Sequence, residues 1–192
     1  MSYIQGRIFS RPHGTTIRLI SLICISKTEK TKVATCNVVR IKSTSATSKT
    51  IIKSCNKAKD AGFKLSCMVI LGLGGKKYSK ENAIETGKVI SAAKPNFVGA
   101  LTLYLENGIK DEFLTKFNEE FIRISDSEAI DELEELVSGI DVNDKVVFRA
   151  NHGSNAYNVA GTFPEDKQAM LDKITWMKEH PEVVRPQGLR GF

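Results

Sequence analysis

The stretch that decides the fold is Leu65–Gly75, LSCMVILGLGG. Its first seven residues form a short apolar run rich in β-forming side chains, with glycines on either side. Such a run predicts a strand buried on both faces. The glycines predict a tight turn from this strand into a helix, because glycine adopts left-handed backbone conformations that other residues avoid.

Outward from this stretch, helical and strand periodicities alternate. Ser125 and Glu128 have the spacing of a capping box, and so do Thr162 and Glu165, so each pair is expected to open a helix. The expected strands are 65–71, 97–105 and 145–150, and the expected helices run from about Ile51 to Gly62, from Ser79 to Lys94, from Lys110 to Phe117, from Ser125 to Ile140 and from Thr162 to His180. This alternation predicts an α/β protein with a parallel sheet, either part of a barrel or the middle of an open doubly wound sheet.

Residues 1–49 differ in charge and pattern from residues 50–192. They hold nine Lys/Arg and one acid, whereas the rest of the chain holds 19 basic and 21 acidic side chains. Strands are expected within 17–25 and 32–42, without a helical stripe between them. The charge step predicts a boundary near Thr50, with a basic segment that is not continuous with the α/β part.

Composition narrows the class of protein. The chain has no run of 18 apolar residues and no secretory signal pattern, so we expect no membrane span and a cytoplasmic location. The four cysteines, Cys24, Cys36, Cys55 and Cys67, are irregularly spaced and are expected to be reduced. We also expect the acidic run 128–135 to be a solvated helix face, and Trp176, Met170 and Met177 to be core residues.

Two polar or glycine-rich segments are expected at the carboxyl ends of strands, where α/β folds place ligands. The first is Gly72–Gly75, which matches no complete phosphate-binding motif and by itself favours a plain strand-to-helix turn. The second, FRANHGSN, contains Asn151, His152 and Asn155, whose side chains can donate and accept protons or hydrogen bonds. An ordinary polar loop is the alternative for this second segment.

Four segments together resemble a known family: AKDAGFKLSCMVILGLGG, NFVGALTLYLENG, VVFRANHGSNAYNVAGTFPEDKQAML and RPQGLRGF. In this combination and order, residues 50–192 are similar to the C-terminal half of radical S-adenosylmethionine (radical SAM) proteins. The likeness is to iron–sulfur oxidoreductases with the Elp/MiaB/NifB-type core.

The resemblance implies a partial TIM barrel of parallel βα units. It also implies a [4Fe-4S] cluster that reductively cleaves S-adenosylmethionine to start radical chemistry on a substrate. Residues 65–71 and 97–105 would be the fifth and sixth strands of that barrel. The positions implied to contact the adenine of the cofactor are Val69, Ile70, Gly72, Gly74, Leu103 and Leu105, and Asn151, His152 and Asn155 would lie on the substrate side.

The chain departs from this family in lacking the three-cysteine loop that holds the cluster. No Cys-x-x-x-Cys-x-x-Cys occurs, so the cluster is not expected to bind this chain alone. We hypothesise that residues 1–49 are foreign sequence, joined near Thr50 by truncation or a frame shift. The chain would then be an inactive fragment, or one completed by a second chain.

Two alternatives from other classes remain open. One is a small α/β binding module whose basic N-terminal arm contacts nucleic acid or an acidic partner. The other is a doubly wound nucleotide-binding domain that uses Gly72–Gly75.

Overall fold

The computed structural model describes residues 20–25, 39–41, 47–105, 107–117 and 120–190. Its strands are β1 (Ile20–Ile25), β2 (Val39–Ile41), β3 (Lys64–Leu71), β4 (Phe97–Thr102), β5 (Val146–Ala150) and β6 (Val159–Phe163). Its helices are α1 (Ser48–Asp60), α2 (Gly75–Ala93), α3 (Asn107–Lys116), α4 (Asp126–Gly139) and α5 (Lys167–Glu179), followed by short 3-10 turns η1 (Pro181–Val183) and η2 (Gln187–Leu189).

All six strands belong to one open sheet with the order β2-β1-β3-β4-β5-β6. The three central strands, β3, β4 and β5, are parallel, as the sequence predicted. Strand β1 lies antiparallel to β3 on one side, and β6 lies antiparallel to β5 on the other. The chain therefore has an α/β fold whose parallel centre is bordered by antiparallel strands.

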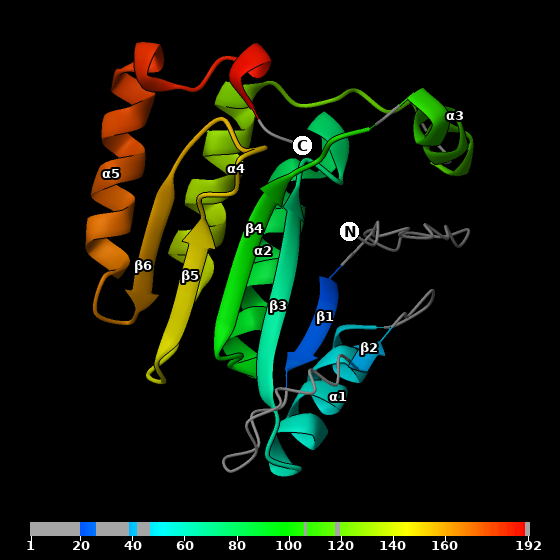
Figure 1. Cartoon of the computed structure of the whole chain (residues 1–192), viewed down its shortest axis with the longest axis vertical. Helices are drawn as coiled ribbons and strands as arrows, with labels where there is room; N and C mark the ends of the chain where they lie inside the picture. The colour runs from blue at the N-terminus through cyan, green and yellow to red at the C-terminus, as the bar shows by residue number, and fades with distance from the viewer. Residues whose placement is uncertain (1–19, 26–38, 42–46, 106, 118–119, 191–192) are drawn as a thin grey trace, which may run out of the picture.

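Helices α2, α4 and α5 cover one face of this sheet. Figure 1 shows α2 and α4 behind the strands and α5 beside β6, and the main core joins side chains of these helices to one side of β3, β4 and β5. Along β3 the residues alternate between buried and half-buried, with Leu65, Cys67, Val69 and Leu71 buried. The expectation that this strand is buried on both faces is therefore wrong, because α2, α4 and α5 pack on the face of Leu65, Cys67, Val69 and Leu71, and the side chains of the other face are only half-buried.

The N-terminal expectations are met in part. Strands β1 and β2 lie within the segments 17–25 and 32–42 that were expected to hold strands. Helix α1 begins at Ser48, capped by the Thr47 side chain, which accepts a hydrogen bond from the Thr50 N–H at 3.3 Å. The remaining residues of 1–46 lie outside the described part of the chain.

Two predicted helix starts are wrong. Helix α2 begins at Gly75 rather than after Ser79, so Ser79 lies inside the helix. Thr162 does not open a helix but belongs to β6, and its N–H donates to the Asp166 carboxylate at 2.8 Å. The turn at 164–166 leads into α5, and the sequence pattern did not indicate the strand β6 before it, which pairs with β5.

The prediction of three core side chains in the last helix is correct for two of them. Met170 and Met177 are buried, but Trp176 is 47% exposed and stacks on the His180 ring, with ring centroids 4.6 Å apart.

Among the residues that the structure describes, no helix has both the length and the apolar character needed to cross a membrane.

Candidate functional site

The carboxyl ends of the three parallel strands lie at one edge of the sheet (Figure 1). After β3 the chain turns through Gly72–Gly74, after β4 it continues through Leu103–Leu105, and after β5 it forms the loop 151–158. All the residues that the sequence singled out, apart from Val69 and Ile70 within β3 itself, follow these strand ends. This edge is the candidate site.

The glycine turn accommodates another part of the same chain. Gly72 and Gly75 have φ angles of +80° and +60°, and the Gly75 N–H donates to the Gly72 carbonyl at 3.0 Å. A Cβ atom on Gly72 would lie 2.9 Å from the Ile124 side chain, and one on Gly75 would lie 3.0 Å from the Ile122 carbonyl oxygen. The close approach that these glycines permit is thus to the segment 121–124.

A buried carboxylate accepts hydrogen bonds from this turn and from α2. Both carboxylate oxygens of Glu132 lie 3.1 Å from the Gly72 nitrogen, which donates to them. The Ser79 hydroxyl also donates to this carboxylate, and the Asn82 amide does so at 3.0 Å. Glu132 is 2% exposed, and this burial raises its pKa, although the hydrogen bonds act in the opposite direction.

The prediction that the acidic run 128–135 is a solvated face is therefore wrong at Glu132. The signal that could have revealed this position was its spacing. Position 132 lies three residues after Ala129 and four before Leu136, on the stripe of α4 that is buried. A carboxylate on a buried stripe requires partners, and Ser79 and Asn82 of α2 supply them.

Three of the predicted adenine contacts come together in a small apolar cluster. Ile70, Leu103 and Leu105 pack with Leu73 on the side of the sheet away from the main core. Val69, by contrast, is 2% exposed and belongs to the helix-side core. Because neighbouring residues of a strand point to opposite faces, Val69 and Ile70 cannot present their side chains to the same ligand.

Aromatic rings complete this apolar cluster. Phe113 of α3 and Phe117 just after it are buried in the cluster, and both rings pack edge-on against Phe121, with centroid distances of 4.9 Å and 4.8 Å. Tyr78 of α2 also packs against the cluster. The result is a largely filled apolar cluster at the carboxyl edge, in which Ile70, Tyr78, Leu105 and Phe121 are the partly exposed members.

Asn155 is placed differently from the other predicted substrate-side residues. It is fully buried, and its side chain accepts from the Thr102 N–H and donates to the Ala100 carbonyl, both at 2.8 Å. Tyr157 lies beside it, with its hydroxyl 2.8 Å from the Thr102 hydroxyl, and burial raises the pKa of this phenol. These contacts tie the loop 151–158 to the end of β4.

His152 and Asn151 are exposed at the same edge. The Ser154 N–H donates to His152 Nδ1 at 3.2 Å, and the Ser154 hydroxyl lies 2.7 Å from the same nitrogen. Nδ1 therefore acts as an acceptor, which leaves the proton of the neutral ring on Nε2. The structure thus separates the exposed Asn151 and His152 from the buried Asn155.

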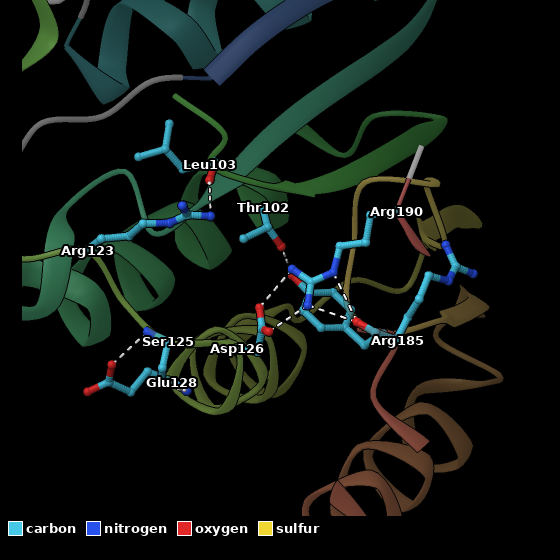
Figure 2. Close-up of polar contacts among 9 residues, drawn as sticks. Thr102, Leu103, Arg123, Ser125, Asp126, Glu128, Arg185 and Arg190 are labelled. Atoms are coloured by element: carbon cyan, nitrogen blue, oxygen red, sulfur yellow. Dashed lines mark hydrogen bonds and ion pairs between the residues drawn. The ribbon is translucent and has the colours of Figure 1, made fainter. Parts of the chain in front are cut away.

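The C-terminal tail reaches this edge and contacts the start of α4 (Figure 2). The Arg190 guanidinium donates to both oxygens of Asp126, at 3.0 Å and 2.5 Å, and to the Arg185 carbonyl. Its side chain is only 4% exposed. Nearby, Ser125 and Glu128 form the capping box that the sequence predicted.

A groove of about 220 Å³ runs between α2 and α4 beside the glycine turn. It is lined by Lys76, Ser79, Lys80, Ile124, Glu128, Asp131, Glu132 and Glu135. Lys76 pairs with Glu128 at 2.8 Å, which lowers the pKa of that carboxyl, and Lys80 pairs with Glu135 at 3.2 Å. Because these ion pairs are exposed, each adds little stability.

Two of the cysteines do not fit the iron–sulfur cluster that the resemblance implies. Cys55 and Cys67 are buried in the helix-side core, on α1 and in the middle of β3, rather than on one loop. Within the described ranges, no three His, Cys, Asp or Glu residues are grouped so that they could hold a metal ion.

Comparison with family models, with curated proteins and with solved structures found no match to this chain.

Proposed function

We propose that this chain is a fragmentary or degenerate member of the radical SAM enzymes that keeps the surface for the adenosine part of S-adenosylmethionine. The observation that supports this most directly is the apolar cluster at the carboxyl edge. Ile70 belongs to β3, Leu103 directly follows the neighbouring parallel strand β4, and Leu105 lies in the same cluster. Ligands of parallel α/β folds bind at this edge, and apolar side chains there can pack against an adenine ring.

The partial barrel is part of the same proposal. Three parallel strands with their helices on one face are what a segment of a TIM barrel would contain. Because β1 and β6 border this segment, a complementing chain would extend the barrel only by displacing one of them.

The proposed activity is binding, without catalysis by this chain alone. Phe113 and Phe117 pack against the same leucines that would contact the adenine. An adenine ring would therefore lie beside these rings or replace one of them. Gly72 would act indirectly, by letting the segment 121–124 pack closely beside the cluster, whereas a Cβ atom on Gly74 would meet Tyr78 of α2 at 3.0 Å.

Isothermal titration calorimetry on the full-length chain tests this proposal. S-adenosylmethionine and S-adenosylhomocysteine are expected to bind, because they share the adenosine group. Leu105→Asp is expected to weaken both by about tenfold or more, since it places a charge in the apolar cluster. Leu114→Asp, on the exposed side of α3, is the matched control and should leave both affinities unchanged.

Two outcomes would overturn the proposal. Binding of ATP and NAD with no preference for S-adenosylmethionine would favour a general nucleotide-binding domain. Absence of binding to all four compounds by the folded protein would exclude the adenosine surface.

A further inference from the structure

Helix α1 carries a row of lysines on the face that points away from the sheet. Lys49, Lys53 and Lys57 follow one another at four-residue spacing, and all three are exposed. Because four residues of an α-helix rise by about 6 Å, the row extends for about 12 Å along the helix axis. These three residues are the lysine row.

The packing of α1 fixes the direction of the lysine row. Ile51, Cys55 and Ala58 are the residues of α1 that contact the main core. With 3.6 residues per turn, the lysine row lies on the opposite side of the helix. Figure 1 shows α1 toward the amino-terminal end of β3, away from the carboxyl edge of the sheet. The lysine row is therefore separate from the proposed adenosine site.

The positive charge of the lysine row is not balanced by neighbouring carboxylates. Among the residues placed by the structure, none forms an ion pair with Lys49, Lys53 or Lys57. The single acidic residue of α1 is Asp60, at its last position. Elsewhere on the surface, Lys76 and other lysines pair with carboxylates of α4. The lysine row is thus complementary in charge to a linear polyanion.

The other side chains of α1 limit the kind of polyanion. The helix, SKTIIKSCNKAKD, contains no aromatic residue on which a base could stack and no arginine for paired contacts to a base. Its apolar side chains face the core, so none is left to enter a membrane surface. Lysine contacts phosphate as a point charge. These features favour a chain of phosphates that carries neither bases nor lipid tails.

We propose that the lysine row binds inorganic polyphosphate. The three ammonium groups contact successive parts of one flexible chain, and each contact releases a counterion from it. Binding of this kind depends on charge and spacing and is weakened by salt. It requires no part of the carboxyl edge, so it stands or fails independently of the adenosine site.

The test measures binding of fluorescein-labelled polyphosphate to the full-length chain by fluorescence anisotropy at several salt concentrations. The variant that combines Lys49→Gln, Lys53→Gln and Lys57→Gln is expected to bind about tenfold more weakly than the wild type, or weaker still. The slope of log affinity against log salt should also become shallower by about 2, since a contact to a single-stranded polyanion contributes about 0.7.

The matched control combines Lys110→Gln, Lys145→Gln and Lys173→Gln. These lysines are also exposed, on α3, before β5 and on α5, and their removal lowers the net charge of +6 by the same three charges. The control should bind polyphosphate with the affinity and salt slope of the wild type. Far-UV circular dichroism of both variants checks that they are folded.

Four results would overturn the proposal. The folded wild type could fail to bind polyphosphate at low salt. Equal weakening in the two variants would show that net charge alone governs binding. Unchanged binding in the lysine-row variant would place the site elsewhere in the chain. Tighter binding of a single-stranded or duplex oligonucleotide with the same number of phosphates would assign the row to nucleic acid instead.

Discussion

Glu132 lies on the face of α4 where Ala129, Leu133 and Leu136 are buried beside it. Its carboxylate receives the Gly72 N–H from the strand-to-helix turn and the side chains of Ser79 and Asn82 from α2. One buried residue thus joins β3, α2 and α4. Because a buried carboxylate without partners is costly, these contacts also select one arrangement of the three elements.

Glu132→Ala is expected to lower the free energy of unfolding by about 3 kcal/mol, because it leaves the Gly72 N–H and the Asn82 amide buried without acceptors. Urea denaturation measures this change. Glu135→Ala is the control, since it removes a carboxylate of the same helix that forms an exposed ion pair with Lys80. The control should change stability by about 0.5 kcal/mol or less. Equal losses in the two variants would contradict the role given to Glu132.

The pH dependence of stability also depends on Glu132. Burial raises its pKa, so the folded protein binds this proton more tightly than the unfolded chain does. Relative to Glu132→Gln, the wild-type free energy of unfolding should be highest below about pH 4.3, the ordinary value for glutamate. It should fall as the pH rises from there through the raised pKa, and then level off. Urea titrations of both proteins across this range measure the difference; an increase with pH would contradict it.

At the scale of elements, β4 needs partners beyond the end of its pairing with β5. The last paired residues are Gly99 and Arg149, yet β4 continues to Thr102. Asn155 from the loop after β5 supplies the missing contacts, since its amide bonds the Ala100 carbonyl and the Thr102 N–H. A side chain thus takes the place of a strand's backbone at this point.

Asn155→Ala is expected to lower the free energy of unfolding by about 2–4 kcal/mol, because two backbone groups of β4 lose their partners. Asn158→Ala, in the same loop but exposed, should have little effect. Thermal and urea denaturation of both variants measure the contrast. A stable Asn155→Ala protein with normal hydrogen exchange at Thr102 would show that the loop does not hold β4.

The elements that the sequence predicted well are those whose buried side chains all lie on one face of the element. The stripe of α4 and the capping box at Ser125 follow from local spacing alone. Strand β6 could not be predicted in this way, because it exists through pairing with β5, and its last residues also fit a helix start. The same limit applies to Gly72 and Gly75, whose role depends on the segment 121–124, about 50 residues further along the chain.

At the scale of the whole molecule, parts of the chain that are distant in sequence contact one another at the carboxyl edge of the sheet. The tail meets the loop after β5, where the Arg185 N–H donates to the Ala156 carbonyl at 2.7 Å and its guanidinium donates to the Gly153 carbonyl at 3.0 Å. Arg190 joins the same tail to Asp126 at the start of α4 (Figure 2). The tail therefore links the loop after β5 to the start of α4, which no strand pairing connects.

Arg190→Ala is expected to undock this tail and to lower the free energy of unfolding by about 2 kcal/mol, because Arg190 is almost fully buried and bonds both Asp126 and the Arg185 carbonyl. Arg190→Lys keeps the charge but cannot bond both carboxylate oxygens in the same way, so its stability should lie between those of the wild type and the alanine variant. Hydrogen exchange at the Arg185 amide reports tail docking directly and should accelerate in Arg190→Ala. Arg123→Ala is the control, because the one bond of that exposed arginine to the described residues is a long one of 3.4 Å to the Leu103 carbonyl. If both alanine variants exchange at the wild-type rate, the tail is held by its backbone and by Arg185 rather than by Arg190.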